Sequence, residues 1–330
     1  MRKAAIIVML LMVGGVAFAQ SKREKVRERV DSVLRARYEK VSYDTLYMER
    51  PDAKLTLKFR GNLSGNSFRV KQTTDEQVRA KLSTDLRATV SAAVTYYGIT
   101  AGLAINPAQI FGGKNKKDWE LNLNAYFNRF GLEVGYQYSK TLSGDITYGH
   151  DESWHLPKDY LRLSNIYVTG YYAFNHRRFS YPAAFTQSYI QKKSAGSWLV
   201  GFSYQGGSIK TTGKATEEYG TEARIYAGNF AIGGGYGYNL VAKKWLFHLS
   251  AQPNIIIFNS NNTKVNGEKS SESLHFPEMI INSRAAILYN ISPKCFVGST
   301  VLVNTSLLGD NDDYTRQVKW RARAFVGIRL

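Results

Sequence analysis

The feature that most constrains the fold of this chain is a two-residue alternation of apolar and polar residues that recurs from Leu55 to Leu330. Successive side chains of an extended strand point to opposite faces, so the alternation predicts strands with one apolar and one polar face. It is clearest in the last segment, where the polar positions include Lys319, Arg321, Arg323 and Arg329, and the apolar positions are Val318, Trp320, Ala322, Ala324, Val326, Ile328 and Leu330. We therefore expect an all-β chain.

Soluble β-sandwiches and membrane β-barrels both alternate in this way, and strand length separates the two classes. Several of the alternating runs reach about 10 to 15 residues, whereas strands of globular proteins have about 5 to 6 residues. A tilted strand that crosses a bilayer needs about 9 to 11 residues. The prediction is a transmembrane antiparallel β-barrel of about 12 strands over residues 53–330, in the outer membrane of a Gram-negative bacterium.

The connections between the runs alternate in length, as in barrels that have short periplasmic turns and long outer loops. Short connections lie near residues 96–98, 128–131, 239–244 and 290–294, and long ones at 107–117, 143–159, 211–221, 259–277 and 308–317. This parity places both termini in the periplasm. The segment 175–195 falls on the short-turn side although it is about twenty residues long. It either hangs below the barrel or folds into it.

The N-terminus predicts an exported protein. Residues 1–19 have the three parts of a cleavable signal peptide, with Arg2 and Lys3 before an apolar run that ends at Ala17, Phe18 and Ala19. Residues 20–52 are expected to form a periplasmic segment that contains a short helix, because a thin apolar stripe recurs there at helical spacing. A charged tether without regular structure is the alternative for this segment.

The formal charge of +18 would ordinarily raise nucleic acid as a partner. Export argues against it, so we expect no nucleic acid to be bound. The expected partners are outer-membrane lipid and lipopolysaccharide, small anionic solutes and the barrel-assembly machinery. The 22 tyrosines suit a membrane interface, where a ring with one polar end is favoured.

Three pieces of sequence resemble a known family. They are Tyr43-Asp44-Thr45 before the first strand, the run RFSYPAAFTQSYIQKKSAGS that begins at Arg178, and Gly235-Tyr236-Gly237-Tyr238. Together they resemble an uncharacterised family of the Bacteroidota, domain of unknown function 4421, over nearly all of the chain after Tyr43. The resemblance implies an outer-membrane barrel, and it implies no activity, because the family has none assigned.

The polar face of the strands carries an excess of cations that would line the lumen. The candidates are Arg60, Arg87, Arg162, Arg224, Arg284, Arg321 and Arg323, and only Glu120 and Glu133 clearly oppose them. In a water-filled pore, such cations concentrate anions, which predicts a narrow, porin-like, anion-preferring channel. The alternative is a structural barrel whose interior is filled by a hydrogen-bonded network of these side chains.

The long segment on the short-turn side is a second candidate site. Its cations bracket aromatic and amide side chains, and the residues singled out are Arg177, Arg178, Phe179, Tyr181, Gln187, Gln191, Lys192 and Lys193. One interpretation is a constriction or plug whose cations bind an anionic solute or a lipid headgroup. The other is a folded periplasmic turn that is packed by its own rings.

An outer-membrane enzyme that acts on lipid, of the phospholipase or lipid A modifying type, is the alternative function. His248 and Ser250 share a strand face, but no nucleophile motif surrounds Ser250 and no acid partner is indicated. Asp151, Glu152 and His155 match no specific metal site. We therefore assign no catalytic residue, metal or cofactor from the sequence.

Overall fold

The computed structural model describes residues 28–33, 35–36, 42–53, 55–73, 77–96, 99–105, 118–149, 152–272, 277–310 and 312–330. The chain divides into two compact units, Met1–Ser42 and Tyr43–Leu330. In the first unit, residues 28–33 and 35–36 are helical, within the segment where a short helix was expected. The expected signal peptide lies outside the described residues. No helix among the described residues is long and apolar enough to cross a membrane.

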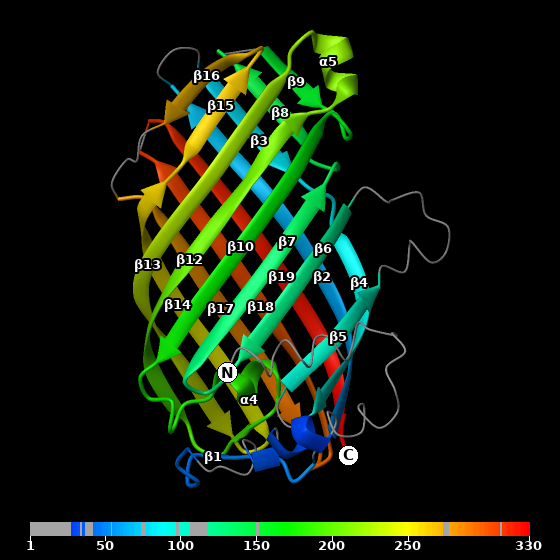
Figure 1. The fold of residues 1–330 in the computed structure, drawn as a ribbon, viewed down its shortest axis with the longest axis vertical. Helices are drawn as coiled ribbons and strands as arrows, with labels where there is room; N and C mark the ends of the chain where they lie inside the picture. Colours follow the sequence, from blue (N-terminus) through cyan, green and yellow to red (C-terminus); the bar gives the residue numbers. More distant parts are fainter. Residues whose placement is uncertain are drawn as a thin grey trace. The chain divides into compact units, whose positions relative to one another are not determined.

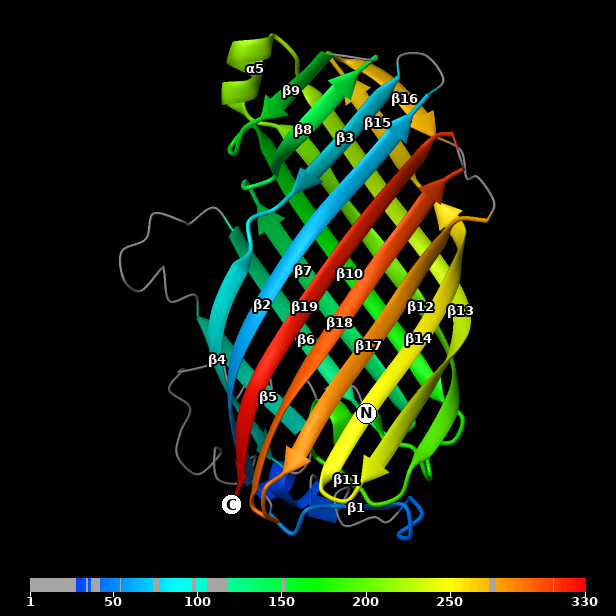
Figure 2. The same cartoon turned by 180° about the vertical axis from the view of Figure 1, so that it is seen from behind.

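The second unit is a β-barrel in which twelve of the described strands form the wall. They are β2 (Leu55–Gln72), β4 (Arg87–Tyr96), β5 (Ile99–Ile105), β6 (Asp118–Tyr126), β7 (Phe130–Ser139), β10 (Leu161–Ala173), β12 (Ala195–Thr211), β13 (Ala223–Ala242), β14 (Trp245–Asn259), β17 (Met279–Asn290), β18 (Cys295–Gly309) and β19 (Tyr314–Arg329). Neighbouring strands pair antiparallel, and the last strand, β19, pairs with the first wall strand, β2. The strands tilt around a common axis (Figures 1 and 2). The prediction of about 12 strands is confirmed.

The two ends of the barrel differ, as the connection lengths predicted. At one end, which we call the turn end, short turns join β6 to β7, β13 to β14 and β17 to β18, and the chain ends there (Figure 1). This end also carries β1 (Met48–Glu49), α4 (Tyr181–Phe185) and β11 (Ile190–Gln191). The opposite loop end carries β3 (Val78–Ser83), β8 (Ser143–Tyr148), β9 (Glu152–Leu156), α5 (Gly213–Tyr219), β15 (Asn261–Val265) and β16 (Glu268–Glu272).

The wall is apolar outside and polar inside, the reverse of a soluble protein. The outward side chains of Trp198 and Leu249 are 68% and 69% exposed, whereas the inward amides of Gln252 and Asn254 are fully buried. A soluble sandwich would bury its apolar face between two sheets. An apolar outer surface around a polar interior is the arrangement of a transmembrane barrel.

Glycines allow β13 to approach its neighbour closely. A Cβ atom added to Gly233 or Gly235 would collide with the carbonyl oxygen of Pro253 or Ala251 on β14. Only glycine fits where another backbone comes this close. The glycine run that the sequence shows therefore serves the packing of the wall.

Candidate functional site

The long segment between β10 and β12 folds back into the barrel, which is one of the two outcomes left open by the sequence. We call residues 178–191 the inserted segment. Its helix α4 contacts β6, β14 and β17, and it lies near the turn end within the ring of strands (Figures 1 and 2). The side chains of Phe179, Tyr181, Ala183 and Ala184 are fully buried. The segment therefore fills the interior of the barrel at this end.

Local sequence explains why this short helix forms. The side chain of Ser180 caps its N-terminus by accepting a hydrogen bond from the backbone N–H of Ala183 at 3.2 Å. Pro182 stands in the first turn, where its fixed φ suits a helix and its missing N–H costs nothing. Thr186 ends the helix, and Gln187 follows in a left-handed conformation with φ 57°. The chain can then turn back to form β11.

Aromatic rings hold the inserted segment against the wall. The ring centroids of Phe179, Tyr181 and Phe185 lie 5.9, 4.9 and 5.1 Å from that of His248 on β14. Tyr181 also lies 4.4 Å from the ring of Tyr171 on β10. Such contacts stabilise a packed core beyond the area that they bury.

Two polar side chains of the wall bind the backbone of the inserted segment. Lys58 on β2 donates from Nζ to the carbonyl oxygen of Thr186 at 2.6 Å and to Oε1 of Gln187 at 3.1 Å. Asn239 on β13 donates from Nδ2 to the carbonyl oxygen of Ser180 at 2.9 Å. A lysine is rarely buried unless its ammonium group has hydrogen-bond partners. The inserted segment supplies these partners to Lys58, and Lys58 in turn holds the segment in place.

Two of the family-like pieces of sequence, about 130 residues apart, contact each other at the turn end. The backbone N–H of Asp44 donates to the carbonyl oxygen of Arg177 at 2.8 Å, and Nε of Arg178 donates to Oδ2 of Asp44 at 3.2 Å. Strand β1 pairs with β11, and Gln191 donates from Nε2 to the carbonyl oxygen of Tyr47 at 3.3 Å. The residues that precede the first wall strand thus bind the inserted segment at the turn end.

The cations that flank the inserted segment lie on the surface. Arg177, Lys192 and Lys193 are exposed. Nζ of Lys192 lies 3.6 Å from a carboxylate oxygen of Glu49, and Nζ of Lys193 lies 5.9 Å from the ring centroid of Tyr47. Lys192 and Lys193 therefore contact the chain's own residues at the turn end, and the constriction is built instead from the rings and the backbone of the segment.

Paired charges fill much of the lumen above the segment. Oε1 of Glu120 accepts from Arg321 at 2.6 Å, and the two oxygens of Glu120 each lie 3.4 Å from a further cation, Lys319 or Arg87. Glu133 binds Arg284 at 2.9 Å and the hydroxyl of Tyr126 at 2.6 Å. Arg284 is 2% and Glu133 3% exposed. Arg87, Arg284 and Arg321 therefore belong to the hydrogen-bonded network that the sequence offered as the alternative to an open pore.

Arg60 and Arg323 differ from these paired cations. Both lie at inward positions on the adjacent strands β2 and β19. The Nε atom of each is buried and has no hydrogen-bond partner among the described residues. They supply positive charge in the interior that no carboxylate of the described chain neutralises.

The expected lumen positions of Arg162 and Arg224 are wrong. Both side chains are exposed, at outward positions of β10 and β13 near the loop end, and Arg224 binds Glu222 at 2.8 Å. Here the strands extend beyond the apolar band, so the outward face is polar as well. The polarity of a residue on such an extension therefore does not indicate whether its side chain points into the lumen.

Amide and hydroxyl side chains fill the middle of the barrel. Asn282 donates to Oγ of Ser203 at 2.6 Å and accepts from Asn304 at 2.5 Å. Beside them lies a cavity of about 10 Å³, also lined by Tyr167 and Lys319. A volume of this size holds about one water molecule.

A hydrogen-bonded chain of serine, histidine and asparagine on β13 and β14 lies next to the inserted segment. Nε2 of His248 is 3.0 Å from Oγ of Ser250, and Nδ1 of His248 is 2.7 Å from Oδ1 of Asn239. The sequence placed His248 and Ser250 on one face but missed Asn239. All three side chains are at most 3% exposed. This order of groups matches that of a nucleophile, a base and an orienting residue.

Comparisons with known proteins found one family model and several solved structures to which the chain is similar. A family model described as domain of unknown function matches residues 42–329, and no curated protein matches the chain. Among solved structures, the chain is similar to the outer membrane protease OmpT of Escherichia coli, with 8% identity and a TM-score of 0.45 over 89% of this chain and 100% of that one. It is also similar to the translocator domain of the autotransporter NalP of Neisseria meningitidis, with 10% identity and a TM-score of 0.31 over 94% and 98%. These similarities concern the fold alone.

Proposed function

Because the chain belongs to the family described as domain of unknown function 4421, whose description assigns no activity, we propose a function from the geometry of the lumen. The protein is an outer-membrane barrel that its own inserted segment keeps closed, and it admits small anions when that segment leaves. The turn end faces the periplasm and the loop end faces the exterior of a Gram-negative cell of the Bacteroidota. The signal peptide over residues 1–19 and insertion by the barrel-assembly machinery belong to the same proposal.

The observation that carries the closed state is the burial of four of the five residues of α4, from Tyr181 to Ala184, inside the ring of strands. Helix, rings and polar anchors occupy the turn end, and amide side chains occupy the middle of the barrel. We therefore expect the lumen to be closed to hydrated ions while the segment is in place. This supports a structural or gated barrel over a permanently open pore.

The preference for anions rests on Arg60 and Arg323. They lie inside the wall near the turn end, where their positive charge has no carboxylate partner among the described residues. Fixed cations with low-dielectric walls attract anions and repel cations. Removal of the inserted segment would open a path past these two side chains.

Single-channel recordings in planar bilayers test this function. The native protein should stay closed for most of the recording. Replacement of residues 175–197 by a four-residue turn should open it, and such a turn is feasible because Phe174 N already donates to Trp198 O at 3.2 Å. The opened variant should prefer anions in a salt gradient. Adding Arg60→Gln and Arg323→Gln should reduce that preference, whereas the outward pair Arg162→Gln and Arg224→Gln should not. A deletion variant that folds but stays silent, or prefers cations, contradicts the proposal.

The hydrogen-bonded Ser250, His248 and Asn239 favour one second candidate, a serine hydrolase that acts on lipid esters. The same geometry also has a structural explanation, because Asn239 anchors the inserted segment through its amide nitrogen. A fluorophosphonate probe separates the two. If the probe labels the opened variant at Ser250, and Ser250→Ala abolishes the labelling, the triad is a catalytic site. If the probe labels neither the native protein nor the opened variant, the three residues serve to hold the segment.

A further inference from the structure

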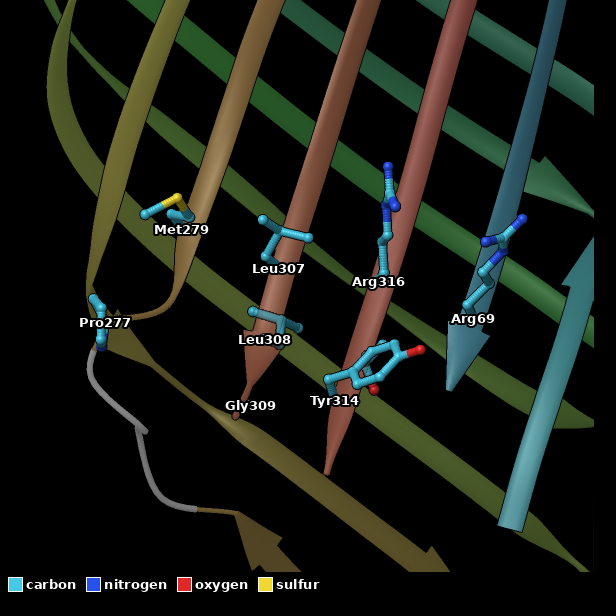
Figure 3. A pocket seen from close by; sticks show the side chains of 9 residues that line it. Arg69, Pro277, Met279, Leu307, Leu308, Gly309, Tyr314 and Arg316 are labelled. Atoms are coloured by element: carbon cyan, nitrogen blue, oxygen red, sulfur yellow. The ribbon is translucent and has the colours of Figure 1, made fainter. Parts of the chain in front are cut away.

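A row of directly paired residues crosses the outer face of the barrel near the loop end, and its character changes along the row. It begins with Met279 on β17 and Leu307 on β18 and continues through Arg316 on β19 and Arg69 on β2 to Lys81 on β3. Figure 3 shows Arg316 and Arg69 on adjacent strands, with Leu307 and Met279 beside them. The row thus joins an apolar surface to three consecutive cations.

Like charges face each other directly across these strands. Arg69 is the register partner of both Arg316 and Lys81. Like charges at directly opposite positions destabilise a sheet. Among the described residues, no carboxylate forms an ion pair with Arg69, Lys81 or Arg316. Within the described part of the chain, these three cations are therefore available to an external anion.

The only carboxylate in the row is already engaged. Asp145 on β8 is the register partner of Lys81, but its Oδ1 lies 2.7 Å from Nδ1 of His155. A second row of outward cations differs in this respect, because its Arg224 binds Glu222 and its Lys210 lies 4.7 Å from the ring centroid of Tyr226. In the first row neither arginine, Arg69 or Arg316, has a carboxylate partner among the described residues, whereas Arg224 in the second row has one.

These cations stand where the apolar band of the wall ends. On β19, the outward positions from Ile328 to Val318 are apolar, and Arg316 is the next outward position. A span of about 10 residues is what a tilted strand needs to cross the hydrocarbon core. With the loop end facing outward, Arg316 and Arg69 lie at the level of the lipid headgroups of the outer leaflet.

A groove beside the cations completes the site. It has a volume of about 310 Å³, and its lining includes Met279, Leu307, Tyr314, Arg316 and Arg69. One flank is apolar and the other is cationic. A ligand that fits this arrangement has an acyl chain attached close to an anionic group.

We propose that Arg69, Lys81 and Arg316 bind the phosphate groups of an outer-leaflet phosphoglycolipid of the lipid A class, with an acyl chain in the adjacent groove. Guanidinium groups bind phosphate through two parallel hydrogen bonds, and several cations in one row match a headgroup with more than one phosphate. The proposal rests on the outer-membrane orientation proposed above. It does not depend on whether the lumen conducts.

Binding of diphosphoryl lipid A to the purified, folded protein, followed by native mass spectrometry from detergent, tests this site. Arg69→Gln with Arg316→Gln should weaken binding by about tenfold or more, because each arginine contributes charge-assisted hydrogen bonds. The matched control is Lys264→Gln with Lys269→Gln, which removes another directly facing pair of cations from β15 and β16, away from the groove. This control should bind as the native protein does.

Three outcomes would overturn the site. They are native binding by the Arg69 and Arg316 double variant, equal binding of dephosphorylated lipid A, and equal binding of phosphatidylglycerol, which has a single phosphate. Lys81→Gln provides a second variant that alters one cation only, and it should weaken binding less than the double variant. None of these readouts involves conductance, so failure of this site and failure of the channel proposal can be told apart.

Discussion

Replacement of Arg284 by methionine is expected to lower the free energy of unfolding of the barrel by about 3–5 kcal/mol. Arg284 and Glu133 form an ion pair at 2.9 Å and are only 2% and 3% exposed. Without the guanidinium, the carboxylate of Glu133 stays buried, and among the described residues the hydroxyl of Tyr126 is its remaining hydrogen-bond donor. The cost is that of a buried charge without a counter-charge. Urea unfolding in lipid vesicles, followed by tryptophan fluorescence, measures it.

Two control variants show whether burial is the cause. Adding Glu133→Gln to the Arg284→Met variant removes the stranded charge and should recover most of the loss. Arg224→Met breaks the ion pair with Glu222, whose side chains are 47% and 51% exposed, and should cost less than about 1 kcal/mol. An Arg284→Met protein as stable as the Arg224→Met protein would show that the lumen network does not hold the barrel together.

Replacement of Phe179 by alanine is expected to loosen the inserted segment by about 3–5 kcal/mol, because Phe179 is fully buried against the wall. A loss of this size increases the population of the released segment by more than about a hundredfold. The change can be followed through a cysteine in place of the fully buried Ala184, in a protein whose native Cys295 is replaced by serine. The rate of its reaction with a maleimide should rise accordingly.

Phe174 provides the matched control for this variant. It is the same residue type near the same end of the barrel, but its side chain is 60% exposed. Phe174→Ala should therefore leave the labelling rate of a cysteine at position 184 unchanged. Equal rates in the two alanine variants would mean that the ring of Phe179 does not hold the segment.

The barrel could be predicted from the sequence because a membrane wall imposes its pattern on every strand. Lipid outside and polar groups inside require strict alternation, and the short turns reveal the strand parity. Arg162 and Arg224 show where this logic fails. Their strands extend beyond the apolar band, and there the outward face is polar, so polarity alone no longer indicates the lumen.

The inserted segment could not be placed from the sequence, because its position depends on contacts between distant residues. Lys58 binds Thr186 and Asp44 binds Arg178, and neither pair leaves a local pattern. Asn239 could have been found. A hairpin whose turn is centred on residues 243 and 244 places position 239 directly opposite His248, as the register confirms. Counting residue pairs outward from this short turn would have placed Asn239 beside His248 and so predicted the hydrogen-bonded chain of Asn239, His248 and Ser250.

The labelling rate of a cysteine at Ala184, in the otherwise native folded barrel with Cys295→Ser, tests most directly whether the segment closes the lumen. A cysteine in place of the exposed Lys193, two residues after the inserted segment, provides the reference. With a membrane-impermeant maleimide applied from both sides, position 193 should react readily, whereas position 184 should react far more slowly, only during the brief release of the segment. If both positions react at the same rate in the folded protein, the segment lies outside the barrel and the closed lumen is contradicted.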